Sequence, residues 1–116
     1  MARIGSSGNG GSSSSAYGPV TVVNVNTGYT ITSAQQGYFF NVDASAEGFE
    51  ITLPIATAGF WVRITDSTGY FSPNIVTLEP ASGTVLIEGI AGGRHLQTAW
   101  GSWLVYSDGT NWFLAS

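Results

Sequence analysis

Residues 99–114 read AWGSWLVYSDGTNWFL, in which two apolar, aromatic runs flank the dipeptide Asp108-Gly109. Because glycine tolerates positive φ, this dipeptide is suited to a tight turn between two antiparallel strands. Side chains alternate between the faces of a strand. That alternation leaves both faces of the first strand apolar, with Trp103 and Val105 on one face and Leu104 and Tyr106 on the other. The stretch therefore predicts a closing β-hairpin that is covered on both sides.

The chain from Pro19 onward follows the same β pattern. Short runs of β-branched and aromatic residues are separated by Gly, Pro, Asn and Ser, which are typical of turns. Strands are expected at residues 20–25, 29–32, 38–43, 49–53, 60–66, 75–78, 84–87 and 96–98, ahead of the hairpin. No segment combines a 3.6-residue apolar period with sensible caps, so no helix longer than one turn is expected.

This spacing of short strands predicts an all-β fold. About eight to ten strands would form a compact, jelly-roll-like β-sandwich or a small barrel, with an extended N-terminal arm. The expected division is a Gly/Ser-rich arm at residues 1–18 and a β-sandwich domain at residues 19–116. The alternating apolar positions predict a core of Ile51, Leu53, Val62, Ile64, Val76, Leu78, Val105 and Leu114.

The composition is poor in charge. Charged residues make up 9% of the chain, against roughly 25% in an average soluble domain. Lysine is absent, and the arginines are Arg3, Arg63 and Arg94. The surface is therefore expected to be rich in Ser, Thr, Asn and Gly and to be covered in part by partners. A net charge of −4 argues against nucleic acid as a partner.

Other broad classes are disfavoured on similar grounds. The chain has no cysteine, so neither a disulfide framework nor a thiolate metal site is expected. It contains no apolar run of about 18 residues, which argues against a membrane span. The N-terminus has no apolar segment of the kind found in signal peptides.

The N-terminal segment has two interpretations. Its Gly/Ser tract cannot bury enough apolar surface to offset the entropy lost on ordering, so it could be a passive tail in solution. Alternatively, it is an arm that orders against a partner protein. In that case Met1, Arg3 and Ile4 would be the anchor.

The sequence contains no catalytic constellation. Glu47 and Glu50 are close in sequence, but solvated loop charge explains them better than a carboxylate pair across a cleft. His95 is the only imidazole and lacks nearby ligands for a metal site. The Gly-rich residues 89–93 lack the Lys and Ser/Thr of a phosphate loop. We therefore expect a non-enzymatic protein with no catalytic residue, no metal and no cofactor.

Aromatic residues, at 13% of the chain, are the best candidates for contacts with other molecules. For Trp103 and Trp112, core or subunit-interface packing is favoured over a sugar platform. Both interpretations stay open for residues at strand ends or near turns, namely Trp61, Tyr70 and Trp100. The candidates for a subunit interface or a receptor contact are Trp61, Tyr70, Trp100, Trp103 and Tyr106.

Four segments also resemble a known family when they are taken together and in order. Leu53-Pro54 with residues 59–66 follows the pattern LP…G-aromatic-x-V-x-I-x-D, and residues 74–83 follow N-x-V-T-I-x-P-x-x-G. Residues 87–89 follow I-x-G, and residues 96–112 resemble the ending L-x-T-x-x-G-S-x-x-L-V-x-D-G-T-N-W. This part of the chain resembles small β-modules of tailed-bacteriophage virion structural proteins.

The resemblance implies a structural role in the virion without catalysis. Such modules occur in tail fibres, baseplate appendages and capsid decoration proteins, usually as trimers. We therefore expect a homotrimeric tail-fibre-type or baseplate-attached protein, anchored to other virion proteins by its N-terminal arm. One alternative is a capsid decoration protein, because the chain lacks the long shaft that commonly carries fibre modules. A further alternative is a module that binds glycans of the host surface.

Overall fold

The computed structural model describes residues 19–116, which form nine short strands and one 3₁₀ turn. The strands are β1 (Val22–Val25), β2 (Tyr29–Thr30), β3 (Phe39–Val42), β4 (Glu50–Thr52), β5 (Trp61–Asp66), β6 (Val76–Glu79), β7 (Arg94–Leu96), β8 (Ser102–Ser107) and β9 (Trp112–Ala115). The 3₁₀ turn, η1, spans Ser33–Gln35. The predicted all-β class, with short strands in two packed sheets, is confirmed.

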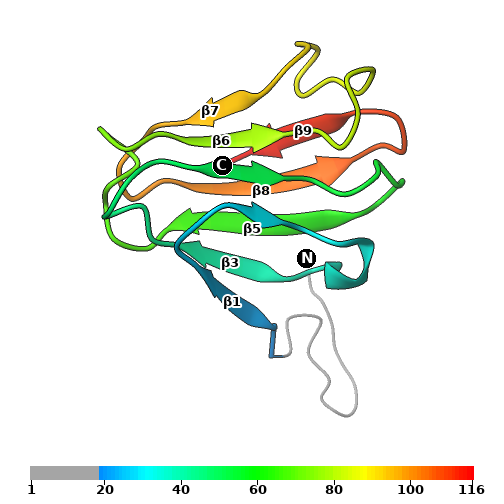
Figure 1. The fold of residues 1–116 in the computed structure, drawn as a ribbon. Coiled ribbons are helices and arrows are strands. Elements are labelled where there is room, and N and C mark those ends of the chain that lie inside the picture. Colours follow the sequence, from blue (N-terminus) through cyan, green and yellow to red (C-terminus); the bar gives the residue numbers. More distant parts are fainter. Residues whose placement is uncertain (1–18) are drawn as a thin grey trace.

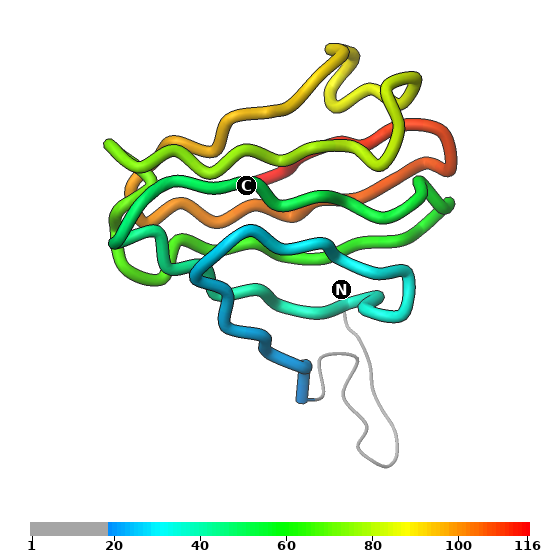
Figure 2. Tube along the Cα trace, viewed as in Figure 1, coloured from blue at the N-terminus to red at the C-terminus, as the bar shows by residue number. Residues whose placement is uncertain are grey.

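The first six strands alternate between the two sheets. Sheet A has the strand order β1-β3-β5-β8-β9, and sheet B has the order β2-β4-β6-β7. Strands β1, β3 and β5 are parallel neighbours, as are β2, β4 and β6. Each pair of strands thus forms one coil, and successive coils stack on one another (Figures 1 and 2). The sequence analysis did not predict this parallel stacking.

The last strands reverse direction and close the two sheets. Strand β7 is antiparallel to β6, whereas β8 is antiparallel to β5 and pairs with β9 as the predicted hairpin. The turn is longer than the expected two residues, because the last pair is Ser107 with Trp112. The carboxylate of Asp108 accepts N–H bonds from Thr110 and Asn111, both at 2.9 Å, and stabilises this four-residue loop.

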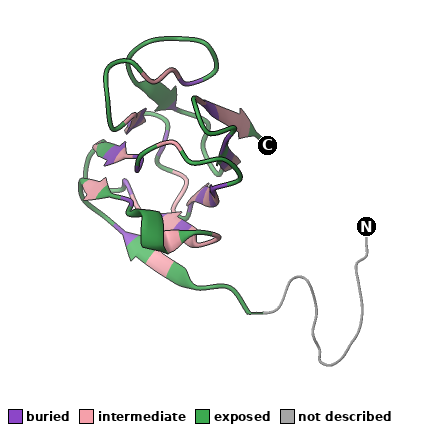
Figure 3. Ribbon diagram, turned by 90° about the vertical axis from the view of Figure 1, so that its right-hand side faces the viewer, coloured by how far each residue is buried: buried purple, intermediate pink, exposed green. Residues whose placement is uncertain are grey.

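The core lies between the two sheets. Seven of the eight predicted core residues are fully buried, and Leu114 is half-buried against them. The largest buried side chain is Trp112, whose ring meets that of Phe60 edge-on at 5.8 Å. The strand expected at residues 84–87 is wrong, because only Ile87 forms isolated bridges there. Most residues of the loop around Ile87, between β6 and β7, are exposed, as is the outer side of β1 (Figure 3).

Candidate functional site

The candidate aromatic residues occupy three different positions. Trp61 and Tyr106 lie opposite each other on the outer face of sheet A. Tyr70 and Trp100 are exposed in loops, at 46% and 68% of their surface. Trp103 packs against the core and stacks on Phe71 at 5.7 Å, so much of its ring serves internal packing. The predicted anchor residues Met1, Arg3 and Ile4 lie outside the described residues.

Part of the outer face of sheet A carries an apolar surface, here called the aromatic face. Its members are outward-facing residues of all five strands: Val22, Phe39, Trp61, Arg63, Leu104, Tyr106 and Phe113. Phe39 meets Trp61 edge-on at 6.4 Å, and Tyr106 stacks on Phe113 at 5.7 Å. Much of this face lines an open groove of about 1120 Å³. Among its members, only Arg63 is charged, and its Nη1 donates to the Ser102 hydroxyl at 3.0 Å.

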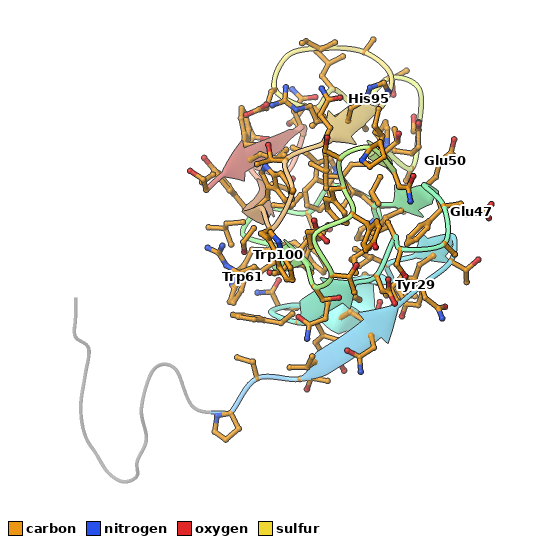
Figure 4. The ribbon with its side chains drawn as sticks, turned by 90° about the vertical axis from the view of Figure 1, so that its left-hand side faces the viewer. Tyr29, Glu47, Glu50, Trp61, His95 and Trp100 are labelled. Carbon is orange, nitrogen blue, oxygen red and sulfur yellow. The ribbon has the colours of Figure 1, made fainter. Side chains whose placement is uncertain are left out.

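The outer face of sheet B has the opposite character. Its outward-facing residues are threonines and ionisable groups: Thr30, Glu50, Thr52, Thr77, Glu79 and His95. Glu47 lies on the same side of the molecule, and Trp61 lies on the opposite side (Figure 4). A sheet face of this composition is suited to water, whereas the aromatic face is suited to cover by another protein surface.

A buried carboxylate organises the loops that follow β5 and precede β8. Asp66 is 1% exposed. Its Oδ1 accepts the N–H groups of Thr68 at 3.2 Å and Gly69 at 2.8 Å, and its Oδ2 accepts those of Phe71 at 3.1 Å and Trp100 at 2.8 Å. Burial raises the pKa of Asp66, but the four N–H groups outweigh burial and bring the pKa below its ordinary value.

The same network fixes the exposed indole of Trp100. This residue has a φ of 63°, in the left-handed region that non-glycine residues seldom occupy. Its ring lies directly over Gly69, where an added Cβ would stand 2.5 Å from the indole Nε1. Gly69 also has a φ of 80°, so a glycine suits both the backbone and the space there. The indole is thus held in place while most of its surface remains open to solvent.

A small polar pocket lies at the ends of β1, β3 and β5. Its volume is about 280 Å³, and the polar side chains that line it are those of Asn24, Asn26, Asn41, Asp43 and Ser67. The parallel register places Asn24 beside Asn41, so equivalent positions of successive coils supply the amides. The pocket is therefore a product of the parallel stacking.

Asp43 connects this pocket to Trp100. Its Oδ1 accepts the Ser45 N–H at 2.9 Å and the Thr68 hydroxyl at 3.1 Å, and Thr68 precedes the glycine beneath the indole. The hydrogen bonds from the Ser45 side chain and backbone hold the pKa of Asp43 below its ordinary value. Asp43 is therefore an ionised acceptor at neutral pH.

Asp66, Asp43 and the asparagines of the pocket were not predicted from the sequence. A signal for Asp66 was present, because an aspartate at the end of an alternating strand and before Ser67-Thr68-Gly69 can accept the N–H groups of a turn. The asparagine pair carried no such signal. Asn24 and Asn41 are 17 positions apart, and only the parallel register brings them together.

Within residues 19–116, no group of three or more His, Cys, Asp or Glu side chains could hold a metal ion. None of the helices in that range is long and apolar enough to cross a membrane. No protein-family model matches the chain, and no curated protein matches it either.

The Asp66 network predicts a loss of stability in acid. An aspartate whose pKa falls on folding stabilises the folded state at every pH above its unfolded pKa of about 3.9. This contribution is lost as the pH falls toward and through the lower pKa of the folded state. We expect the temperature of the unfolding midpoint to decrease when the pH is lowered below about 4. The decrease is expected to be smaller in Asp66→Asn than in the wild type. Scanning calorimetry of both proteins at pH 7 and pH 3 measures this. Equal falls in the two proteins would contradict it.

Proposed function

We propose that the chain is a non-enzymatic structural module of a tailed-bacteriophage particle, of the tail-fibre or baseplate-attached type, and that it assembles as a homotrimer. The observation that carries the proposal is the aromatic face, an apolar surface that crosses all five strands of sheet A. The family and the trimer come from the resemblance of residues 49–116. The N-terminal arm is proposed to attach the module to other virion proteins.

The aromatic face by itself is small for a stable interface, so a stable assembly needs a further contact on each subunit. Five strands about 4.8 Å apart, with about 3.3 Å per residue along a six-residue strand, give a face of roughly 24 by 20 Å. A stable interface buries about 800 Å² on each partner, which exceeds that flat area. A closed ring of three gives each subunit two contacts and thereby provides the additional buried surface.

The character of the face supports cover by protein. Each aromatic side chain can bury about 150–250 Å², and burial of apolar surface contributes about 25 cal/mol per Å². The guanidinium of Arg63 is planar and can stack on aromatic rings of a neighbouring subunit while it keeps its bond to Ser102. In a chain with so few charges, such a surface is more useful for association than for solubility.

Sedimentation equilibrium of the full chain tests the trimer. Three chains of 12.1 kDa give an expected mass of about 36 kDa. Tyr106→Glu places an unpaired charge in the face and is expected to shift the mass toward one chain. Thr52→Glu, on the outer face of sheet B, is the matched control and is expected to leave the trimer intact.

Two results would contradict the self-association: a wild-type monomer at tens of micromolar, or equal dissociation by both variants. Circular dichroism of each variant confirms that it is folded. A capsid decoration protein would also be a trimer, so the position of the chain in a virion map distinguishes that alternative.

A further inference from the structure

We propose that the loop end of the molecule binds a neutral saccharide, with the indole of Trp100 as a stacking platform and the pocket of Asn24, Asn41 and Asp43 as the polar partner. This end is called the Trp100 site below. It goes beyond the structural role proposed above and does not depend on it, because all of its residues belong to one chain.

Trp100 is held in place before any ligand binds. A tryptophan in the left-handed region carries backbone strain, and such strain persists only where the surroundings impose it. Here the surroundings are the buried carboxylate of Asp66, which accepts the Trp100 N–H, and Gly69, over which the ring lies. Even so, 68% of the residue remains exposed. A rigid, open aromatic ring suits a ligand with a flat face of C–H groups, as a pyranose has.

The pocket supplies polar groups without a hydrogen-bond partner in the described residues, and the loop that carries Thr68 and Gly69 connects it to the ring. Within the described part of the chain, the side chains of Asn24, Asn26 and Asn41 form no hydrogen bond, and Oδ2 of Asp43 has no partner. An amide can both donate and accept, as a sugar hydroxyl does, and a carboxylate oxygen accepts from a hydroxyl. The pocket therefore matches the polar edge of a sugar, while the indole matches its apolar face.

The charge of the pocket selects a neutral ligand. The ionised Asp43 lies in the pocket, and neither described arginine lines it. Arg63 donates to Ser102 on the aromatic face, and Arg94 pairs with Glu88 at 3.2 Å. Phosphorylated, uronic or sialylated glycans would meet a carboxylate there without a compensating cation. The same reasoning disfavours a nucleotide, which also has a flat ring but carries phosphate.

Continuity across the surface joins the two parts of the site. The Thr68 hydroxyl donates to Asp43 at 3.1 Å, and the next residue is Gly69, beneath the indole. The ring and the pocket are thus linked through two consecutive residues of one loop. The proposed ligand is an oligosaccharide that engages both parts.

The test is titration of the full chain with neutral oligosaccharides of glucose, galactose, mannose and N-acetylglucosamine, and with uronic and sialylated oligosaccharides. Tryptophan fluorescence and calorimetry report binding. We expect at least one neutral probe to bind in the micromolar to millimolar range, and the acidic probes to bind roughly tenfold more weakly or not at all. Failure of every neutral probe to bind, or equal binding of the acidic probes, would overturn the proposal.

Variants locate the binding on the surface. Trp100→Ala keeps the backbone N–H that Asp66 accepts, and is expected to weaken binding roughly tenfold or more. Gly69→Ala displaces the indole without changing its chemistry and is expected to weaken binding similarly. Ile90→Ala, which removes an exposed apolar side chain from the loop between β6 and β7, is the control and is expected to keep wild-type affinity.

The readouts separate this proposal from the trimer. Wild-type affinity in Trp100→Ala would overturn the saccharide site, whatever the oligomeric state. Sedimentation of Trp100→Ala and Gly69→Ala is expected to give the same mass as the wild type, because neither residue belongs to the aromatic face. A monomeric wild-type chain that still binds a neutral sugar through Trp100 would overturn the trimer and leave this site standing.

Discussion

Asp66→Asn is expected to lower the free energy of unfolding by about 3 kcal/mol, because each buried N–H left without an acceptor costs about 1–3 kcal/mol. The carboxylate presents two acceptor oxygens to two pairs of N–H groups. An asparagine of the same shape turns one oxygen into an NH₂ group, which faces one pair of donors and cannot accept from them. The remaining pair also loses a charged acceptor, which is stronger than a neutral one.

Urea unfolding of Asp66→Asn and Asp108→Asn at the same protein concentration measures this effect. Asp108 also accepts two backbone N–H groups, but at an exposed turn where water replaces them, so its variant is expected to lose less than about 1 kcal/mol. Equal losses in the two variants would show that the buried position of Asp66 carries no special weight. Asp66→Asn is also expected to release the loop that carries Trp100, so the tryptophan fluorescence of the folded protein is expected to change.

Trp112→Ala is expected to have the largest effect, a loss of about 4 kcal/mol. Trp112 is the largest fully buried side chain, and it packs edge-on against Phe60 at 5.8 Å. Its removal opens a cavity at the point where the closing hairpin meets the core. The backbone N–H of Trp112 also donates to the Leu86 carbonyl, and its carbonyl accepts from the Glu88 N–H. These two hydrogen bonds attach the long loop after β6 to β9.

Trp112→Phe is the control for the loss of ring volume. The Nε1 of Trp112 is buried without a hydrogen-bond partner in the described structure, which is unfavourable in the wild type. Phenylalanine keeps most of the ring volume and removes this N–H. The loss in free energy of unfolding is therefore expected to be at least about 2 kcal/mol smaller for Trp112→Phe than for Trp112→Ala. Urea unfolding at one fixed protein concentration compares the two, because stability of an oligomer depends on concentration. Equal losses would contradict the cavity explanation.

The two proposed surfaces are compatible with one another in a particle. The aromatic face and the residues Asn24 and Asn41 both lie on the outer side of sheet A, but toward opposite ends of β1 and β3. The rest of the Trp100 site belongs to the loops beyond the strands. Association confined to the aromatic face would leave the loop end of the molecule free for a ligand. The acidic, threonine-rich face of sheet B would then remain in contact with water.

Local alternation explains what could be predicted from the residues. The faces of β8 are as expected, with Val105 buried and Tyr106 exposed, because successive side chains of any strand point to opposite sides. The core positions Ile51, Val62 and Leu78 follow from the same rule and are fully buried. The candidate residues Trp61 and Tyr106 could be recognised as apolar positions near strand ends, but their meeting on one face could not.

The pairing of the strands needed the tertiary structure. A run such as β1 or β3 has the same alternation whether its neighbour is parallel or antiparallel, and whether that neighbour follows it or comes two strands later. The parallel coils therefore left no local trace in the sequence. With them came the juxtaposition of Asn24 and Asn41, and the position of Asp43 beside the loop that carries Thr68.

The alternation of residues along the chain was enough to establish an all-β protein with a closing hairpin, a largely known core and two apolar faces on β8, because each of these depends on neighbours in sequence. Only the folded chain decided the parallel coils, the four-residue turn at Asp108, the clamp around Asp66 and the position of Trp100 over Gly69. Each of these depends on contacts between residues far apart in sequence or on the satisfaction of individual backbone N–H groups. Neither is encoded in a pattern of apolar and polar positions.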